Sequence, residues 1–498
     1  MAQIQEKSIA RPPIVAVMGH IDHGKSTLLD YIRKTNIVET EAGGITQRIS
    51  AYEVAHKRED GSEQKITFLD TPGHQAFQAM RSRGAAVADI AILVVSAEDG
   101  VKPQTIEALN TILSAKIPYI VAINKIDKPQ ANVEKTKQTL SEAGIYLEGY
   151  GGNIPFVPIS AKHGDNIPDL LSMILLVSDL EGLTGDMGKN AEGVVIESSM
   201  DPKKGITATI IVTDGKLQTG EFAVSNDSIC PLRMIEDFSG KKIEEATFSS
   251  PIRLIGWSTL PKVGAEVSVV KTKKEAEELV KICRENNKCC TEDECIPDGA
   301  IIVPILIKTD VAGMADAVLN EVKKLTTDKV FLRIISSEAG PISENDIKRC
   351  LPFPGTIILG FNASVDSRAK DLAEQNGITI EAFSIIYKLT EWLEEEIIKR
   401  TPKSEVEEVI GTLQILKNFS QVKDRQVVGG KVVSGRVTLG NVRVMRRESE
   451  IGRGEIIEIQ QSKIKTKEVT EGECGLMVES KITLAPSDKL EAIVKVVK

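Results

Sequence analysis

The sequence lacks the features that mark membrane, secreted and disulfide-rich proteins. No apolar run reaches the roughly 18 residues that a membrane-spanning helix needs. Residues 1–13 show no charged segment followed by an apolar one, which is the pattern of a secretory signal. Cysteine is scarce, at 7 of 498 residues, and an odd number spread over a long chain argues against a disulfide framework. We therefore expect a cytoplasmic protein that does not enter a membrane.

The composition is that of an ordinary folded protein. Hydrophobic residues make up 41% and charged residues 27% of the chain, which argues against disordered and fibrous classes. The length favours three or four domains of about 100–200 residues each. A net charge of −9 argues against a protein that binds nucleic acid without specificity.

The first part of the chain, residues 1–183, alternates apolar runs with helical stretches. Such alternation predicts a parallel-rich sheet with helices on both faces. Helices are expected at residues 104–114 and 133–142, and buried strands at residues 14–19, 65–70, 91–97, 119–125 and 156–161.

The next part has a different pattern, because its apolar runs are short, rich in β-branched residues and separated by turn pairs. We expect residues 184–272 to form a β-barrel, with Asp214–Gly215 as the turn of a hairpin. Residues 273–299 read as a connector that begins with a charged helix.

Three further segments complete the predicted organisation. Residues 300–383 alternate strands and helices again, as a second α/β domain without a phosphate loop. Residues 384–403 read as a connecting helix that ends before Pro402. Its apolar stripe consists of Ile386, Leu389, Leu393 and Ile397. Residues 404–498 return to strands and predict a C-terminal β-barrel.

A phosphate-loop motif follows the first predicted strand and opens a helix. The pattern G-x-x-x-x-G-K-[ST] provides backbone N–H groups and a helix N-terminus for phosphate, a lysine for the β- and γ-phosphates and a hydroxyl for Mg²⁺. A chance glycine turn is the alternative, and the strand–loop–helix context argues against it. The predicted nucleotide-binding residues are Gly19, His20, Ile21, Asp22, His23, Gly24, Lys25, Ser26 and Thr27.

Three more motifs follow later strands, in the order that a GTP-binding domain requires. The first can place Asp70 near Mg²⁺ and a glycine near the γ-phosphate, and it consists of Asp70, Thr71, Pro72, Gly73 and His74. The second can offer a carboxylate to the N1–H and amino group of guanine, and it consists of Asn124, Lys125, Ile126 and Asp127. Alone it would be read as a solvated turn. The last can touch the base and consists of Ser160, Ala161 and Lys162.

These motifs and several further segments resemble bacterial translation initiation factor two, a family of translational GTPases. The resemblance includes GHIDHGKS, EAGGITQ at residues 41–47, DTPGHQAF, NKID and the run that starts at Arg81. It continues through GVVIESSMDPKKG, VPILIKTDVAGMADAV, IIYKLTEWLEEEI and GECG, and so covers nearly the whole chain. Relatives usually carry a long extension before the GTPase domain, which this sequence lacks.

The resemblance implies roles for particular residues. Thr46 would bind Mg²⁺ together with Ser26 and Asp70, and His74 would hold the attacking water. Asp22 would be a ligand of a structural monovalent cation. The implied ligands are GTP or GDP and Mg²⁺, and the implied activity is GTP hydrolysis stimulated by the ribosome.

The C-terminal barrel matches the family only in part. Glu473, Cys474 and Gly475 match residues that would hold the formyl-methionyl end of initiator tRNA. Lys431 and the run Gln460-Gln461-Ser462 stand where the family has a second cysteine and a basic–basic–aromatic run. Two readings of Cys474 stay open, a ligand pocket and a buried apolar position.

The resemblance implies a monomeric initiation factor whose partners are both ribosomal subunits and initiator tRNA. Two alternatives stay open from the sequence. One is another translational GTPase, for elongation or delivery of a special tRNA, and the other is a nucleotide-sensing ribosome-binding module with weak hydrolysis.

Two clusters outside these motifs also allow alternative readings. Cys283, Cys289, Cys290 and Cys295 could bind zinc, although their spacing lacks paired C-x-x-C motifs and favours free thiols. The arginines Arg443, Arg446 and Arg447 could face RNA phosphates or form a solvated barrel face.

Overall fold

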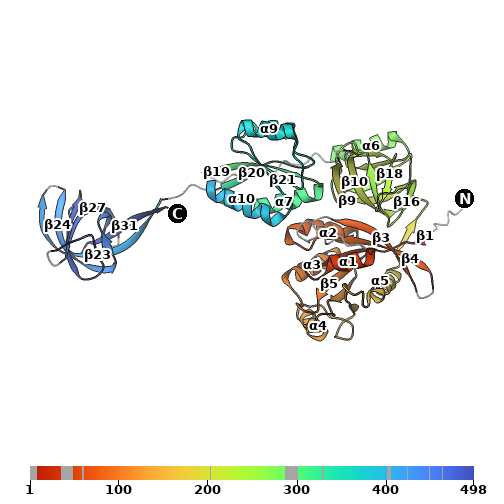
Figure 1. Ribbon diagram of the computed structural model, residues 1–498, viewed down its shortest axis with the longest axis horizontal. Coiled ribbons are helices and arrows are strands. Elements are labelled where there is room, and N and C mark those ends of the chain that lie inside the picture. The colour runs from red at the N-terminus through yellow and green to blue at the C-terminus, as the bar shows by residue number, and fades with distance from the viewer. Residues whose placement is uncertain are drawn as a thin grey trace. The chain divides into compact units, whose positions relative to one another are not determined.

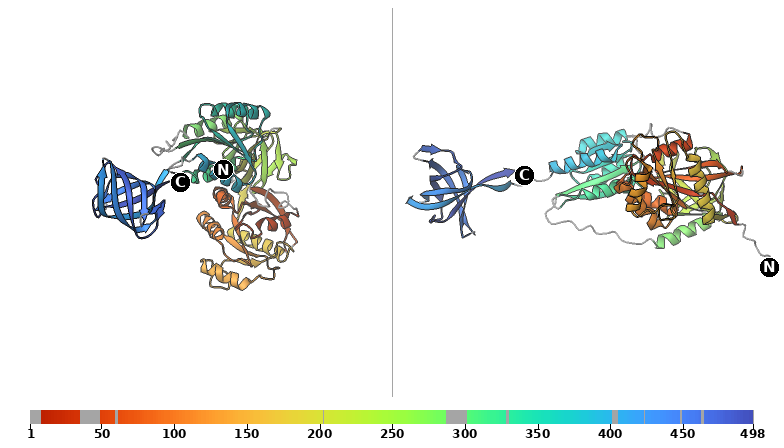
Figure 2. Two further views of the ribbon diagram at one scale, coloured as in Figure 1. Left: turned by 60° about the vertical axis from the view of Figure 1, so that its left-hand side comes forward. Right: turned by 90° about the horizontal axis from the view of Figure 1, so that it is seen from below.

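The computed structural model describes residues 8–34, 49–58, 61–201, 203–286, 301–327, 330–400, 405–422, 424–447, 449–461 and 464–497. Contacts divide the chain into two compact units, Met1–Lys399 and Arg400–Lys498. Figures 1 and 2 show the helices and strands of both units, and each unit is described below by itself.

The first α/β domain, at residues 8–183, is built on a six-stranded sheet in the order β3-β4-β2-β5-β6-β7. Neighbouring strands run parallel except for the antiparallel edge pair β3–β4. Apolar clusters cover both faces, so the predicted class of this domain is confirmed. The strands are β2 (Ile14–Gly19), β3 (Ser50–Lys57), β4 (Glu63–Asp70), β5 (Ile90–Ser96), β6 (Tyr119–Asn124) and β7 (Phe156–Pro158), and the helices are α1 (Lys25–Arg33), η2 (Gln75–Phe77), α2 (Gln78–Val87), α3 (Pro103–Ala115), α4 (Val133–Glu142) and α5 (Ile167–Glu181).

The central strands of this sheet place the sequence motifs at one edge. Every residue of β2 and β5 is buried, which explains their continuous apolar character. Asp70 pairs in register with Val17, and Ser96 pairs with Asn124. Because parallel strands end at the same edge of a sheet, the loops after β2, β4 and β6 meet there.

The first barrel follows as an eight-stranded antiparallel sheet around its own apolar core. Its order is β13-β12-β18-β9-β10-β17-β14-β15. Two short ribbons accompany it, β1 with β8 and β11 with β16. The bounds are β1 (Ser8–Ala10), β8 (Thr184–Asp186), β9 (Glu192–Asp201), β10 (Gly205–Asp214), β11 (Lys216–Gln218), β12 (Phe222–Ser225), β13 (Ser228–Pro231), β14 (Ile235–Asp237), β15 (Lys242–Ile243), β16 (Glu245–Thr247), β17 (Pro251–Ile255) and β18 (Glu266–Val270).

The expected hairpin at Asp214–Gly215 is wrong. β10 pairs with β9 and β17, whereas β11 pairs with β16. Gly215 has φ 78°, and a Cβ there would lie 2.4 Å from Asn190 O. The glycine therefore lets the chain turn a tight corner against Asn190 and leave the sheet of β10, instead of folding back along it.

The helix predicted for the connector is α6 (Lys273–Asn286), and it packs on the first barrel. Ala276 and Val280 are buried against Val224 of β12. Figure 1 shows α6 lying across this barrel.

The second α/β domain has four parallel strands in the order β20-β19-β21-β22. Helices α7 and α10 lie on one side of the sheet and α9 on the other (Figure 1). The predicted stripe of Ile386, Leu389, Leu393 and Ile397 is confirmed as the buried face of α10. The bounds are β19 (Ile301–Thr309), β20 (Val330–Ala339), β21 (Ile357–Phe361), β22 (Thr379–Phe383), α7 (Ala312–Lys324), α8 (Glu344–Cys350), α9 (Ser367–Asn376) and α10 (Ile386–Arg400).

The two α/β domains share one apolar cluster. It runs from Phe77 and Met80, on η2 and α2, to Met314 on α7 and Leu389 on α10. Arg83 of α2 forms an ion pair with Asp316 of α7 at its edge. The segment after β4 is therefore packed directly against the second α/β domain.

The second unit is a closed β-barrel, as predicted. Its strands follow the order β26-β31-β23-β24-β30-β27-β28, and pairing between β26 and β27 closes the sheet around one core. Figure 2 shows the strands of this barrel in blue. The bounds are β23 (Glu405–Val422), β24 (Arg425–Gly435), β25 (Val437–Thr438), β26 (Gly440–Arg446), β27 (Ser449–Gln461), β28 (Ile464–Thr466), β29 (Glu468–Val469), β30 (Glu473–Ser480) and β31 (Lys489–Val497).

Among the helices in the described part of the chain, none combines the length and the apolar character that spanning a membrane requires.

Candidate functional site

The phosphate-loop residues form a tight turn between β2 and α1. Gly19 and Gly24 have φ of 144° and 87°, and Asp22 has φ 65°. A Cβ on Gly19 would lie 2.4 Å from Val94 O, so the strand–loop junction requires glycine. Gly24 is the N-cap of α1, and no side chain caps this end of the helix, which is the end that attracts anions.

The ammonium of Lys25 lies inside this loop. Its Nζ donates to Gly19 O at 3.0 Å and to His20 O at 2.8 Å. Burial lowers the pKa of Lys25 to about 8, and the nearby Asp70 carboxylate opposes that shift. A phosphate in the loop would add negative charge beside Nζ and favour the charged form.

The turn after β4 lies against the phosphate loop. Thr71 Oγ1 donates to Val17 O at 2.7 Å, which ties the turn to β2. A Cβ on Gly73 would lie 2.4 Å from Lys25 Nζ and 3.2 Å from Ile21 N. The structure thus brings the second motif to the first, and only glycine leaves Lys25 its place.

Arg81 holds the same turn through two of its carbonyl groups, a role that the sequence did not indicate to us. Its guanidinium donates to Pro72 O at 3.1 Å and to His74 O, and it pairs with Glu107 of α3. Arg81 is 1% exposed, and burial lowers its pKa while Glu107 opposes the shift. The sequence signal that could have indicated this role is the position of Arg81 beside small and apolar residues of α2, where a buried arginine needs a charged partner.

His74 caps the short helix η2. Its Nδ1 accepts from Ala76 N at 2.9 Å, so in the neutral ring the proton belongs on Nε2. The ring centroid lies 4.3 Å from that of Tyr387 and 5.9 Å from that of Phe77, both edge-to-face. Burial lowers the pKa of His74, so the imidazole is neutral at pH 7.

The third and fourth motifs are joined to the phosphate loop by Asn124. Its Nδ2 donates to His23 O at 2.9 Å, and its Oδ1 accepts from Ala161 N at 2.9 Å. Ser160 Oγ donates to Asp127 Oδ1 at 2.8 Å, and this hydrogen bond lowers the pKa of Asp127. The carboxylate is therefore held ionised and oriented at the end of β6.

His23 lies wholly buried beneath the loop. Its Nδ1 is 3.3 Å from Val94 O, and its ring lies 4.9 Å from that of His20. Burial lowers the pKa of His23 to about 3. This histidine is a neutral packing element of the loop.

Other residues predicted to bind the nucleotide or Mg²⁺ divide into three groups. Asp22, Thr27 and Lys162 are exposed around the loops, whereas Ser26 and Ile126 are half-buried within them. Thr46, with the whole segment 41–47, lies outside the described residues. His163, which the motifs did not include, lies with Nε2 3.8 Å from Asp127 Oδ2.

The arrangement suits a nucleotide with a bound divalent cation. Buried Asp70 ends β4 near Lys25, and Ser26 begins α1. A carboxylate and a hydroxyl are hard oxygen donors of the kind that Mg²⁺ prefers.

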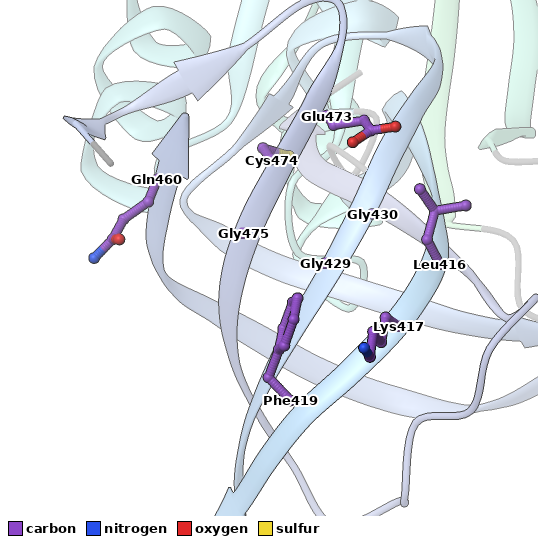
Figure 3. Close-up of a pocket in the computed structure, with 9 residues that line it drawn as sticks. All are labelled: Leu416, Lys417, Phe419, Gly429, Gly430, Gln460, Glu473, Cys474 and Gly475. Atoms are coloured by element: carbon purple, nitrogen blue, oxygen red, sulfur yellow. The ribbon is translucent and has the colours of Figure 1, made fainter. Parts of the chain in front are cut away.

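A separate cavity of about 420 Å³ opens in the C-terminal barrel (Figure 3). Its floor consists of the glycines of β24 and β30, and Phe419 and Lys417 of β23 stand beside it, with Lys417 Nζ 5.9 Å from the Phe419 ring centroid. A Cβ on Gly430 would lie 2.2 Å from the Leu413 side chain. The lining residues are Leu416, Lys417, Phe419, Gly429, Gly430, Gln460, Glu473, Cys474 and Gly475.

The three residues predicted for the tRNA end therefore line one cavity. Cys474 is also 6% exposed, and burial raises the pKa of its thiol. The residue therefore lines the cavity and is buried at the same time, so a ligand pocket and a buried apolar position both remain possible uses of it. The Gln460 side chain points away from Phe419 and Lys417 in Figure 3. Lys431 pairs in register with Glu473 but does not line the cavity, and Ser462 lies outside the described residues.

The structure describes the two remaining clusters in part. Arg443 donates to Glu407 at 2.6 Å and Arg446 to Asp488 at 2.7 Å, so these cations are already paired within the barrel. Cys283 lies half-buried on α6, whereas Cys289, Cys290 and Cys295 lie outside the described residues. Within the described ranges, no group of three or more His, Cys, Asp or Glu side chains could hold a metal ion.

Family models match three stretches of the chain. Residues 11–179 match the elongation factor Tu GTP binding domain, residues 190–270 match elongation factor G domain 2, and residues 284–394 match translation-initiation factor 2.

Curated relatives match along almost the whole chain. Translation initiation factor IF-2 of Clostridium perfringens is 38% identical over 98% of this chain and 73% of its own length. IF-2 of Aquifex aeolicus is 40% identical over 97% of this chain and 61% of its own length, and the chloroplastic IF-2 of Rhodomonas salina is 39% identical over 97% and 65%. Among solved structures, GDP-bound aIF5B from Aeropyrum pernix superposes with a TM-score of 0.50 at 26% identity, covering 97% of this chain and 92% of that one.

Proposed function

This chain belongs to the translation initiation factor IF-2 family, and we propose that it promotes binding of initiator tRNA to the small ribosomal subunit and joining of the subunits. Its GTP-binding domain makes it a GTPase, and the ribosome stimulates the hydrolysis that ends the step. The observation that carries this proposal is the meeting of four motif loops at one sheet edge, joined by Lys25 and Asn124.

In this proposal the phosphate loop and α1 bind the phosphates, and Lys25 leaves its carbonyl partners for the β- and γ-oxygens. Asp127, held by Ser160, accepts the two N–H groups of guanine. Ser26 and Asp70, with Thr46, hold Mg²⁺, which neutralises phosphate charge when bound. Asp22 binds a monovalent cation beside the loop.

His74 holds the attacking water in line with the γ-phosphate. Phosphoryl transfer requires positioning more than a strong base, so a neutral imidazole that donates from Nε2 is sufficient. The ring must first leave its present place against Tyr387.

In the C-terminal barrel, Glu473, Cys474 and Gly475 receive the aminoacyl end of initiator tRNA. The cavity in Figure 3 has the size of a small-molecule site and combines an aromatic ring, a cation and a carboxylate. Filter binding of formylated and unformylated initiator tRNA to the full chain tests this assignment, with Gly475→Val as the variant that fills the cavity, because a Cβ on Gly475 would meet nothing closer than Gln460 O at 3.9 Å. We expect the variant to lose tRNA affinity without losing GDP affinity; equal tRNA binding would contradict the assignment.

Subunit-joining kinetics test the whole proposal. We expect the chain to accelerate joining with GTP or a non-hydrolysable analogue, and to leave the ribosome only with GTP. His74→Ala should keep GTP affinity and lose ribosome-stimulated hydrolysis, whereas His56→Ala, a histidine on β3 outside the motif loops, should behave as the wild type.

No acceleration of joining would refute the initiation role. Unchanged stimulated turnover in His74→Ala would refute the role of the histidine alone, because nucleotide binding and joining do not depend on it.

A further inference from the structure

Two consecutive residues of the turn after β4 contact different elements of the first unit. The Cα of Gly73 is so close to the phosphate loop that a Cβ there would meet Lys25 Nζ at 2.4 Å. The ring of His74 lies instead 4.3 Å from Tyr387 of the second α/β domain. The side chain assigned to hydrolysis is therefore held against α10, whereas the residue before it lies against Lys25.

His74 lies near charged groups of three helices. Those that act on its ring are Glu321 and Lys324 of α7, Arg81 of α2 and Glu107 of α3. Its Nδ1 is occupied by Ala76 N–H, and Arg81 holds its carbonyl oxygen. The backbone and one ring nitrogen are thus fixed, and the remaining contact of the ring is aromatic.

Tyr387 is held firmly in its place, because it lies in the first turn of α10. The neighbouring Ile386 and Leu389 are buried in the apolar cluster that both α/β domains share. Tyr387 itself is 46% exposed and is not part of that buried stripe. It therefore touches His74 without carrying the packing of α10.

We propose that Tyr387 is a positioning residue that holds the His74 ring against the second α/β domain. Because the ring cannot hold the attacking water while it stays in this contact, GTP hydrolysis starts only after α10 and η2 separate. The inference rests on the proposed role of His74 as the residue that holds the attacking water. The edge-to-face contact at 4.3 Å is made between the rings of Tyr387 and His74. The phenol hydroxyl of Tyr387 is therefore not needed to hold His74.

Single-turnover GTP hydrolysis without ribosomes tests this function with two variants of the full chain. Tyr387→Ala removes the ring and should raise the rate about two- to tenfold, the range that one aromatic contact spans. Tyr387→Phe keeps the ring and should hydrolyse GTP as slowly as the wild type. Ile398→Ala, at a position 72% exposed on the same helix, is the matched control and should change nothing.

The double variant Tyr387→Ala/His74→Ala shows whether the gain passes through the histidine, and we expect it to have none. A gain that persists in the double variant, or a Tyr387→Ala rate equal to the wild type, overturns the proposal.

Histidine NMR separates this inference from the proposed function. The chain has only five histidines, so the His74 signal can be identified with the His74→Ala variant. We expect the pKa of His74 to rise toward its ordinary value in Tyr387→Ala, as its burial decreases, and to stay low in Tyr387→Phe. If His74 proves unnecessary for hydrolysis, the proposed function of the residue fails. An unchanged pKa of His74 in Tyr387→Ala would instead refute the proposal that Tyr387 holds its ring.

Discussion

At the scale of single residues, the nucleotide site depends on buried polar side chains that hold backbone atoms. Asn124 links two loops through its amide, Arg81 holds two carbonyl groups of a third loop, and Thr71 ties that loop to β2. Removing one partner from such a buried pair costs about 1–3 kcal/mol, more when a charge is involved. These residues therefore set the geometry of the loops that the motif residues occupy.

Asp127→Asn should change the base that the site prefers. The carboxylate accepts from both N–H groups of guanine, whereas an amide can donate to the carbonyl that xanthine has in place of the amino group. We expect GDP affinity to fall about 100-fold or more, since hydrogen bonds to charged groups contribute about 1.5–3 kcal/mol each. Xanthosine diphosphate should bind the variant better than the wild type. Fluorescent-nucleotide titration measures both, and Lys128→Ala, on the exposed neighbour, is the control.

His23 should make the first unit acid-sensitive. Its pKa is about 3 in the folded chain and ordinarily 6.5, so the folded state keeps it neutral while the unfolded state takes up a proton below pH 6.5. Stability is full above pH 6.5 and falls as the pH drops from 6.5 toward 3, by up to about 1.4 kcal/mol per pH unit. Denaturant unfolding between pH 7 and pH 4 measures this slope. His23→Asn should unfold with a flatter pH dependence; an equal slope would show that other groups cause the loss.

At the scale of elements, α10 links the second α/β domain to the turn that carries His74. Leu393→Ala removes a fully buried side chain from its stripe and should lower the free energy of unfolding of the first unit by about 2–5 kcal/mol. Ile398→Ala, at a position 72% exposed, should change it by less than about 0.5 kcal/mol. Thermal unfolding compares the two. Similar losses in both variants would mean that the stripe does not carry the packing of the helix.

The elements that the sequence predicts well are those with a simple burial pattern. β2 and β5 are buried at every position and α10 on one stripe, so composition and periodicity identify them. β3 was not foreseen, because it is a half-exposed edge strand with polar residues between its apolar ones. α2 was not foreseen either, since it contains a glycine and two arginines, one of them fully buried.

The site divides in the same way. The loop motifs are local, so the sequence predicts which residues stand together at the ends of β2, β4 and β6. The contact between His74 and Tyr387 joins residues more than 300 positions apart, and no local pattern indicates it. The hairpin expected at Asp214–Gly215 failed for a related reason: the turn residues predict a turn, but the strand that receives the chain is chosen by tertiary packing.

At the scale of the whole molecule, the two units should unfold separately. Each has its own apolar core, and GDP should bind only the first. Calorimetry of the full chain should show two transitions, of which GDP at 100 times its Kd raises the stability of one by about 2.7 kcal/mol. Leu476→Ala, in the core of the C-terminal barrel, should lower only the other. A single transition that both changes shift would contradict independent units.

The shared core of the two α/β domains also restricts how the sequence can change over time. A Cβ on Gly313 of α7 would lie 3.2 Å from Cε of Met80 on α2. A lineage that enlarges the residue at 313 therefore requires the end of the Met80 side chain to shift by a few tenths of an ångström, so the two positions are expected to covary. Met80 lies six residues after His74 and belongs to the apolar cluster that both α/β domains share. Selection on the packing of the second α/β domain therefore also acts on the segment that carries His74.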